Sequence, residues 1–413
     1  MKDVPWLSLF NLTFLQMCVS GVINSSSVLS AYIIDDMHFT KAQIGLIGSA
    51  ACVGQALLSV LFGVLLDRKG RRFWVVICCT CICICIMIAS LANTFLFYMS
   101  MLILVGCWCA FSTPYGAKEV SACSPRHVSS FSLSVRQTGV PLGTLMMTLI
   151  LPSIAKRAGW QAAIRCAGAI VLAYGAIHYL TYAFKKDKAD RVSASQAERN
   201  GGPAVTRRFL TNKNYWFIVL SGTVFMGMQY VLLTYMPLFL SETCGLSVEA
   251  AASCLVISQI GGSLARVFLG IISDRFFKST SRALLILESG IMIGVMLLMQ
   301  AFTMHTPMWL CFVAATLFGA SAMGWNGLHT AAISHIVVPE NRGLGTGVMM
   351  ATIQVGTLSV PFIVGKLVDI GLGYKKGFLF CCVLIAIAIL LLSFADEQVI
   401  GEHSVGQAAK EAL

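Results

Sequence analysis

The sequence predicts an all-α membrane protein whose twelve transmembrane helices form two pseudo-symmetric bundles of six. Of its 413 residues, 57% are hydrophobic and 11% are charged, whereas a soluble domain is about a quarter charged. The apolar residues gather into twelve runs, each near the roughly twenty residues that a helix needs to cross a bilayer. The two halves of the chain also repeat each other. Together these observations indicate that much of the protein surface faces lipid.

The apolar runs are joined by short connections with one exception. Residues 185–213 are charged, contain Gly and Pro and lack apolar periodicity, which is typical of a linker. We therefore expect an N-terminal bundle over 1–184, a cytoplasmic linker over 185–213, a C-terminal bundle over 214–394 and a cytoplasmic tail over 395–413. The predicted spans are 7–33, 43–66, 73–92, 95–117, 128–152, 161–184, 214–240, 248–272, 283–303, 308–335, 343–367 and 375–394.

Lysines and arginines in the connections predict the orientation. With a cytoplasmic N-terminus, the cytoplasmic side carries 20 of the 29 basic residues and the outer side carries 7. Positive charge is retained on the cytoplasmic side of membrane proteins. The bias places both termini in the cytoplasm and the protein in the plasma (inner) membrane. It also explains the net charge of +11 without nucleic acid, because no single basic domain exists.

The repeat is visible at fixed offsets. Shifting the second span by 207 positions superimposes Gly63 on Gly270 and Asp67-Arg68 on Asp274-Arg275. Shifting the fifth span by 217 positions superimposes Gln137 on Gln354. Six helices per repeat make the repeats parallel, and transporters built from repeats bind substrate near the midplane between them.

The sequence does not support other functional classes of protein. The sixteen cysteines lie mostly in apolar runs without paired CxxC spacing, so we expect buried small apolar side chains and no metal. No HExxH, GxSxG or P-loop motif is present, so we expect neither an enzyme nor a cofactor. A receptor-like membrane sensor remains a weaker alternative.

Three ionisable residues fall inside predicted spans, where charge is costly and is a functional candidate by default. Arg136 lies in the fifth span and Arg266 in the eighth, and Glu288 lies closer to the end of the ninth. Two arginines and one acid leave positive charge uncompensated, which an anion in the pathway would balance. Alternatively, each arginine satisfies helix-end carbonyls or pairs with an acid.

The loop after the second span reads GVLLDRKGRR, and the second half carries a partial copy, GIISDRFFKSTSR. This motif resembles the signature of the major facilitator superfamily, and with twelve spans the resemblance covers the whole chain. Gly63 permits close helix approach, and Asp67 can accept bonds from the start of a neighbouring helix. The resemblance implies that this helix begins near Arg342–Gly345. The predicted gating residues are Gly63, Asp67, Arg68, Gly70, Arg71, Asp274 and Arg275. The alternative is a purely charge-anchoring loop.

Two further motifs resemble anion-transporting branches of the superfamily. The stretch Gly261–Arg266 resembles oxalate/formate and monocarboxylate carriers, in which an arginine at this place binds the substrate carboxylate. Gly262 stands where animal monocarboxylate carriers have an acid, so their proton relay does not carry over. The run SVRQTGVPLG over 134–143 resembles cyanate-permease-like proteins, and Pro141 within it interrupts the helix ladder.

Neutral polar and aromatic residues occur on the spans that line the cavity in this fold, where they either orient substrate or join helices. With the two arginines, the predicted binding set comprises Asn24, Gln55, Tyr115, Gln229, Tyr230, Tyr235, Gln259, Trp325, Asn326 and Gln354. His329, taken as the only histidine well inside a span, and Glu288 are the candidates for proton coupling.

We therefore expect a secondary transporter that imports a small or medium organic anion such as a carboxylate, with protons as the candidate coupling ion. It should act as a monomer in the bilayer. The main alternative is a proton-driven exporter of drugs or metabolites. Cationic-drug exporters usually carry an acid in the N-terminal bundle, and spans one to three and five to six here have none.

Overall fold

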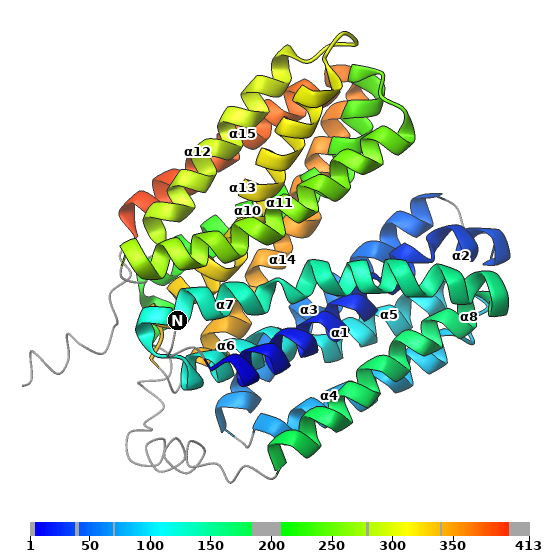
Figure 1. Ribbon diagram of the computed structural model, residues 1–413, viewed down its shortest axis with the longest axis vertical. Coiled ribbons are helices and arrows are strands. Elements are labelled where there is room, and N and C mark those ends of the chain that lie inside the picture. The colour runs from blue at the N-terminus through cyan, green and yellow to red at the C-terminus, as the bar shows by residue number, and fades with distance from the viewer. Residues whose placement is uncertain are drawn as a thin grey trace, which may run out of the picture.

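A computed structural model describes residues 5–37, 41–68, 71–183, 208–277, 281–338 and 341–395. Its elements are helices connected by short turns (Figure 1). They are α1 (Trp6–Val28), α2 (Ser30–Met37), α3 (Lys41–Arg68), α4 (Arg71–Ala89), α5 (Phe95–Cys109), α6 (Ser112–Cys123), η1 (Arg126–Val128), α7 (Ser129–Gln137), α8 (Gly139–Ala183), η2 (Arg208–Thr211), α10 (Lys213–Cys244), α11 (Val248–Phe276), α12 (Arg282–Leu298), η3 (Met299–Ala301), α13 (Met308–Ile336), α14 (Arg342–Leu367), η5 (Val368–Leu372) and α15 (Gly373–Phe394).

Apolar helices long enough to cross a bilayer dominate the described chain. Eight such stretches are present, with two shorter ones at Ala50–Leu66 and Phe73–Ala89. Two of the eight, Ser129–Leu180 and Arg342–Phe394, have 52 and 53 residues, about twice what one crossing needs. The first turns back at Gly159, whose φ of 82° is accessible to glycine without strain. The second turns at Gly371, with φ of 86°. The arrangement matches the predicted twelve-span layout and makes the chain a multi-pass membrane protein.

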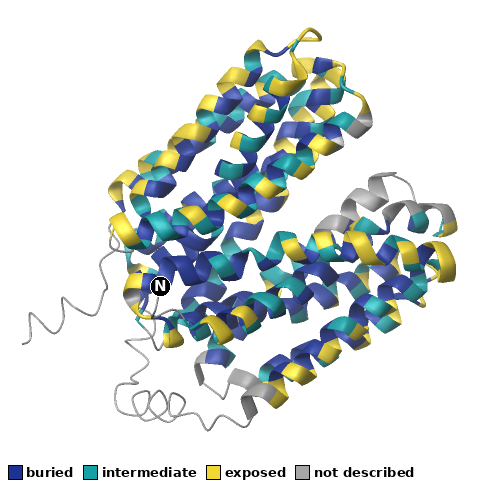
Figure 2. Ribbon diagram, in the orientation of Figure 1, coloured by how far each residue is buried: buried dark blue, intermediate teal, exposed yellow. Residues whose placement is uncertain are grey.

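Each half of the chain has its own hydrophobic core. One cluster draws almost entirely on residues between Leu9 and Tyr174, and the other on residues between Phe209 and Ala395. The two bundles are separate in Figure 1, and Figure 2 shows buried residues along the middle of each with exposed residues on the outside. Many exposed side chains are large and apolar, such as Phe10 and Leu149, both 70% exposed. Such a surface suits contact with lipid.

The sequence repeat reappears in the packing. A Cβ at Gly106 would lie 2.1 Å from the carbonyl oxygen of Ala51, so α5 and α3 approach at backbone distance. In the second half, a Cβ at Gly319 would lie 2.0 Å from the carbonyl oxygen of Ser258, on α13 and α11. Positions 51 and 258 are related by the same 207-residue shift that relates the motifs. Small residues let membrane helices approach in this way.

The bundles touch at one end and diverge toward the other (Figure 1). The N-terminal end of α1 and the junction of α6 with α7 lie at the touching end. A Cβ at Gly63 of α3 would lie 2.5 Å from the Gly343 carbonyl oxygen at the start of α14. A Cβ at Gly270 of α11 would lie 2.9 Å from the Phe131 Cα at the start of α7. These matched contacts hold the bundles together where the predicted motifs lie.

Two predicted spans each contain a junction between two helical segments. In the fourth span, α5 and α6 meet at Ala110 and Phe111, and α6 extends to Cys123, beyond the predicted end of the span. In the fifth span, α7 and α8 meet at Thr138, whose backbone stays helical with φ of −64° and ψ of −18°. One helical hydrogen bond is missing at this second junction, because Pro141 lacks the N–H that the carbonyl of Gln137 would accept. The Gln137 carbonyl can therefore accept a hydrogen bond from another element.

Candidate substrate and coupling site

Arg136 projects into the N-terminal bundle from the last turn of α7. Its side chain is 1% exposed, so it reaches neither lipid headgroups nor water. Nη2 donates to Gln16 Oε1 at 2.6 Å and to the Ser112 carbonyl at 2.7 Å. The same Gln16 oxygen accepts a bond from the Ser112 hydroxyl at 2.6 Å. Three helices, α1, α6 and α7, therefore place this guanidinium.

The remaining face of Arg136 has unused donors. Nε and Nη1 are buried and have no hydrogen-bond partner among the described residues. The backbone of Gly116 provides the room, because a Cβ there would lie 1.8 Å from Nε. Buried N–H groups of a charged side chain are expensive to leave unpaired. Two donors of a buried guanidinium therefore remain without an acceptor among the described residues.

Arg266 of α11 joins the two bundles. It is 1% exposed, and its Nε donates to the Met323 carbonyl of α13 at 2.7 Å. Nη1 donates to the Gln137 carbonyl of the N-terminal bundle at 2.6 Å. Of these two carbonyls, Gln137 lies at the end of α7, as the helix-end alternative above expects, whereas Met323 lies in the middle of α13. Because Gln137 follows Arg136, both arginines converge on one turn of α7.

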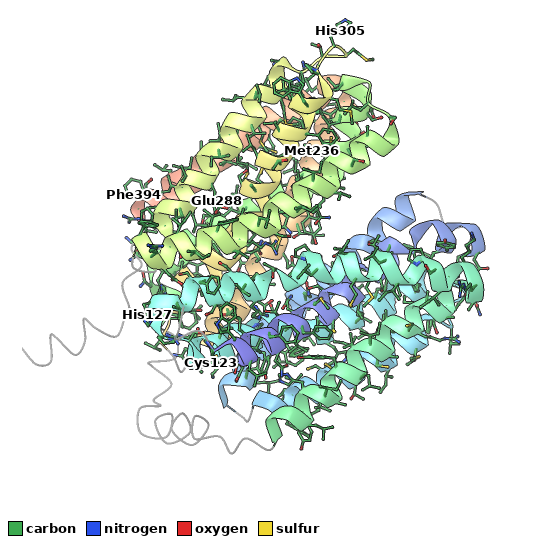
Figure 3. The ribbon with its side chains drawn as sticks, in the orientation of Figure 1. Cys123, His127, Met236, Glu288, His305 and Phe394 are labelled. Atoms are coloured by element: carbon green, nitrogen blue, oxygen red, sulfur yellow. The ribbon has the colours of Figure 1, made fainter. Side chains whose placement is uncertain are left out.

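Glu288 of α12 lies inside the C-terminal bundle (Figure 3). Its side chain is 3% exposed, and neither carboxyl oxygen has a hydrogen-bond partner within the described chain. A Cβ at Gly324 would lie 2.1 Å from Glu288 Oε1. Gly324 follows Met323, whose carbonyl binds Arg266. The acid and the arginine therefore meet at the same turn of α13 without a direct ion pair among the described contacts.

Several predicted binding residues are brought together at the bundle interface. Gln354 Nε2 of α14 donates to Gln55 Oε1 of α3 at 2.8 Å. Tyr230 of α10 lies with its hydroxyl 3.4 Å from the Cys52 sulfur of α3. Both contacts cross from one bundle to the other, as the predicted positions on lining helices require. They close the interface beyond the level of Gly63.

Other predicted binding residues bond within one bundle. Asn326 Nδ2 donates to Gln229 Oε1 at 3.1 Å, between α13 and α10. Asn24 Nδ2 donates to the Thr144 hydroxyl at 3.0 Å, between α1 and α8. These four side chains are half-buried, and the bonds fix the orientation of their amides.

The remaining predicted binding residues lie apart. Tyr235 donates to the Pro361 carbonyl at 2.9 Å, and the half-buried Gln259 sits on α11. Tyr115 is buried inside the N-terminal bundle with its hydroxyl 2.8 Å from His178 Nε2. No described hydrogen bond joins these three side chains to the arginine donors described above. Tyr115 nevertheless precedes Gly116, against which Arg136 Nε packs, and is close enough to interact electrostatically with Arg136.

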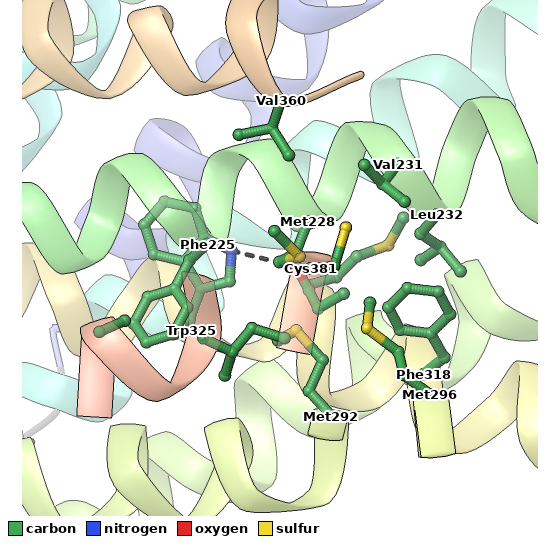
Figure 4. Close-up of a cluster of buried hydrophobic side chains, with 14 of the residues drawn as sticks. Phe225, Met228, Val231, Leu232, Met292, Met296, Phe318, Trp325, Val360 and Cys381 are labelled. Carbon is green, nitrogen blue, oxygen red and sulfur yellow. Dashed lines mark hydrogen bonds between the residues drawn. The ribbon is translucent and has the colours of Figure 1, made fainter. Parts of the chain in front are cut away.

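Trp325 and His329 belong to the core of the C-terminal bundle. Trp325 is 1% exposed and packs against Phe225, at 5.7 Å between ring centroids (Figure 4). His329 Nε2 lies 2.7 Å from the Ile218 carbonyl and its Nδ1 is buried without a partner in the described residues. Trp325 is therefore surrounded by apolar side chains of the core, which is the environment of a structural residue.

The sequence profile of the Major Facilitator Superfamily matches residues 9–361. The chain belongs to the major facilitator superfamily. It is similar to the hexuronate transporter of Bacillus subtilis (25% identity, 85% of this chain and 86% of that protein), the gentisate transporter of Corynebacterium glutamicum (24%, 83% and 77%) and the gallate transporter of Pseudomonas putida (23%, 83% and 80%).

Solved structures of the superfamily share the fold. FucP, described as crystallised in the outward conformation, superimposes with a TM-score of 0.76 at 16% identity, over 94% of this chain and 98% of FucP. The proton:xylose symporter XylE gives a TM-score of 0.75 at 15% identity, over 95% of both chains. These comparisons confirm the predicted fold and the resemblance to anion-transporting members, and they make the protein a membrane transporter.

The second copy of the superfamily motif joins the two bundles. Asp274 accepts from the backbone N–H groups of Ser130 at 3.2 Å and Phe131 at 2.8 Å, at the start of α7. Arg275 is exposed, with its guanidinium carbon 5.7 Å from the centre of the Phe276 ring. In the first copy, Gly63 contacts α14 as expected.

The rest of the first copy is outside the description. Gly70 and the side chains of Asp67, Arg68 and Arg71 lie outside the described residues.

Sequence reasoning missed three buried polar residues in this transporter. His178 is fully buried, so the prediction that only His329 lies well inside a span is wrong. His335 is 6% exposed, and its Nε2 lies 3.0 Å from the Ser129 hydroxyl across the interface. Lys118 is 8% exposed and donates to the Leu66 carbonyl at 3.1 Å. His178 lies inside its predicted span, whereas Lys118 follows the end of the fourth predicted span and His335 is the last residue of the tenth.

Proposed function

We propose that this transporter imports a small organic anion carrying at least one carboxylate, together with protons. The observation that carries the proposal is the uncompensated charge of Arg136. Its buried guanidinium keeps Nε and Nη1 unpaired among the described residues, and its bound partners, Gln16 and the Ser112 carbonyl, are neutral. Buried charge persists where a partner or a ligand completes it. A carboxylate supplies both the charge and the two acceptor oxygens.

The named relatives support the anionic class. Hexuronate, gentisate and gallate are all carboxylates, and their transporters are each similar to more than four-fifths of this chain. The identities of 23–25% are too low to select one of these compounds. The class is therefore proposed at the level of a hydroxylated or aromatic carboxylate.

Glu288 is the proposed proton carrier. A carboxyl group buried without a hydrogen-bond partner is far cheaper to hold neutral than charged. Arg266 reaches the same turn of α13, so ionisation of Glu288 would be felt at the arginine. His329 is the second candidate, since its Nδ1 is buried and unpaired in the described part of the chain.

Transport is proposed to follow alternating access. The N-terminal bundle (1–184) and C-terminal bundle (214–394) would rock about the arginines, with the linker over 185–213 and the tail over 395–413 in the cytoplasm. The excess of lysine and arginine in the connections at the touching end of the bundles supports a cytoplasmic position for this end in the inner membrane. The diverging end of the bundles in Figure 1 would then face the outside, and the protein would act as a monomer.

The test is uptake by the purified protein in proteoliposomes. Radiolabelled glucuronate, gentisate, gallate and a cationic drug are offered with and without an inward proton gradient. We expect gradient-stimulated uptake of at least one carboxylate. Arg136→Ala should reduce this uptake by at least tenfold, because about 1.5–3 kcal/mol attaches to a hydrogen bond to a charged group. Arg157→Ala, an exposed arginine beside the Gly159 turn, is the control and should transport normally.

Two outcomes would reject the proposal. Uptake or exchange of the cation without any carboxylate would make the protein an exporter-type carrier. Carboxylate uptake that is equal in Arg136→Ala, Arg157→Ala and wild type would remove the arginine from substrate binding.

A further inference from the structure

The carbonyl that Arg266 binds is free for a covalent reason. In an α-helix the carbonyl of residue i accepts the N–H of residue i+4. For Gln137 that residue is Pro141, which has no N–H. The backbone stays helical at Thr138, and the Gln137 carbonyl accepts instead from Arg266 of the other bundle, whose Nη1 donates at 2.6 Å. A proline in one bundle thus creates the acceptor that the other bundle binds.

The surrounding contacts make this bond a junction between bundles. Arg266 also donates to the Met323 carbonyl at 2.7 Å, so its guanidinium links α11, α13 and the junction of α7 with α8. One turn earlier on α7, Ser134 packs into the opposite bundle: Cβ atoms at Gly327 and Gly270 would lie 2.1 Å and 2.8 Å from its hydroxyl oxygen. This part of α7 therefore moves with the C-terminal bundle only while these contacts persist.

We propose that Pro141 is a positioning residue for transport: it frees the Gln137 carbonyl to hold Arg266 in the substrate-free protein, and the substrate anion releases the bundles by replacing that carbonyl. The replacement rests on the proposed function, because it needs an anionic substrate. A neutral carbonyl offers one acceptor to the guanidinium, while a carboxylate offers two and a charge. The exchange is therefore favourable, and it removes a bond that ties the bundles at their touching end.

Pro141→Ala tests the device while leaving Arg266 intact. Alanine restores an N–H that can pair with the Gln137 carbonyl within the helix, so the carbonyl competes less for Arg266. Pro152→Ala is the matched control, because Pro152 lies in the same helix and frees the carbonyl of the exposed Thr148. Fluorescent noncanonical amino acids at two exposed positions report the separation of the bundles without replacing native cysteines. One is Lys156, just before the Gly159 turn of α8, and the other is His305, labelled at the diverging end of the C-terminal bundle in Figure 3.

We expect two results for Pro141→Ala. Without substrate, energy transfer between the two labels should rise relative to wild type, because the touching end releases and the diverging end closes. With the carboxylate found by uptake, the dissociation constant should fall by about threefold to tenfold, the range of one neutral hydrogen bond. If Pro141 only shaped the helix, Pro141→Ala would bind the carboxylate more weakly, or neither the energy transfer nor the dissociation constant would change as expected. Pro152→Ala should match wild type in both measurements.

Arg266→Lys provides a second variant should Pro141→Ala not fold. Lysine keeps the charge but lacks the planar fork that bridges Met323 and Gln137, so energy transfer without substrate should again rise. Unchanged energy transfer in the folded variants would overturn the proposal, as would weaker anion binding in folded Pro141→Ala. Failure of the proposed function looks different: wild type would bind no carboxylate, while the substrate-free shift in Pro141→Ala would remain.

Discussion

Asp274, near the end of α11, accepts a hydrogen bond of 2.8 Å from the backbone N–H of Phe131 in the opposite bundle. Its other oxygen accepts from the N–H of Ser130 at 3.2 Å. The carboxylate therefore caps the first turn of α7, where free N–H groups and the helix dipole favour negative charge. Gly270, one turn earlier on α11, allows this approach. The pair closes the touching end of the bundles from the C-terminal side.

Replacing Asp274 by Asn should loosen this end. The amide keeps an acceptor oxygen but loses the charge, at a cost of about 1–2 kcal/mol for a partly buried helix-dipole contact. Energy transfer between labels at Lys156 and His305 should rise, and the initial rate of uptake should fall by about tenfold. The control is Asp369→Asn, an exposed acid in η5 on the opposite side of the membrane. Equal rates for Asp274→Asn and wild type would contradict the capping role.

Gly116 should be indispensable for a different reason. A Cβ at this position would lie 1.8 Å from Arg136 Nε, so Gly116→Ala must displace the guanidinium. Displacement costs the bonds to Gln16 and Ser112, and we expect the apparent KM for the carboxylate to rise by at least tenfold. Gly290→Ala is a strict control, because a Cβ there meets no atom within 4 Å. A KM for Gly116→Ala within twofold of the Gly290→Ala value would contradict this placement of Arg136.

The spans and the repeat could be predicted because they depend on local composition. Hydropathy marks each crossing, and the offset of 207 residues survives in the paired contacts of Gly106 with Ala51 and Gly319 with Ser258. Asp274 was likewise placed by its motif, at the start of a helix in the other bundle as expected for Asp67. These features follow from the spacing of residues along the chain and from the rule that small residues allow helices to approach closely.

The partners of buried polar groups could not be predicted, because they depend on rotation of each helix. Sequence placed Arg136 and Arg266 inside the membrane but gave no means of seeing that one faces Gln16 and the other the Gln137 carbonyl. Tyr115 was assigned to the pathway, whereas its hydroxyl faces His178 within one bundle. Pro141 was recognised as a helix breaker. The use of the carbonyl it frees required the other bundle to be in place.

Gln55 and Gln354 provide a quantitative test of bundle contact. Their bond of 2.8 Å crosses the interface between α3 and α14. Gln55→Leu leaves the buried Gln354 amide without this partner, and Gln354→Leu leaves the half-buried Gln55 amide without it. Either change should cost about 1–3 kcal/mol in the touching arrangement. The double variant should recover part of it, with a coupling energy of about 0.5–1.5 kcal/mol. The free energies come from energy-transfer populations of the four proteins, and strictly additive effects would mean that the two side chains do not interact.

His178 should stabilise the N-terminal bundle. Its Nε2 lies 2.8 Å from the Tyr115 hydroxyl and its Nδ1 2.7 Å from Asn11 Oδ1, which joins α6, α8 and α1. His178→Ala removes both bonds from buried groups, so we expect the melting temperature in detergent to fall by about 5 °C or more. His305→Ala, at an exposed turn before α13, should leave it within a degree or so of wild type. Equal melting of the two variants would show that this network contributes nothing to stability.

Replacing Glu288 should separate proton-driven accumulation from exchange of the substrate. In Glu288→Gln the neutral amide imitates the protonated acid, so the site can no longer change charge beside the turn of α13 that holds Arg266. We expect exchange of labelled for unlabelled carboxylate across the liposome membrane to continue at a rate within about threefold of wild type, since exchange needs no net proton release. Accumulation driven by a pH gradient should disappear. Glu242→Gln, an exposed acid at the C-terminal end of α10, is the control and should still accumulate substrate. Gradient-driven accumulation by Glu288→Gln at the wild-type level would assign the proton to another group, with His329 the next to be replaced.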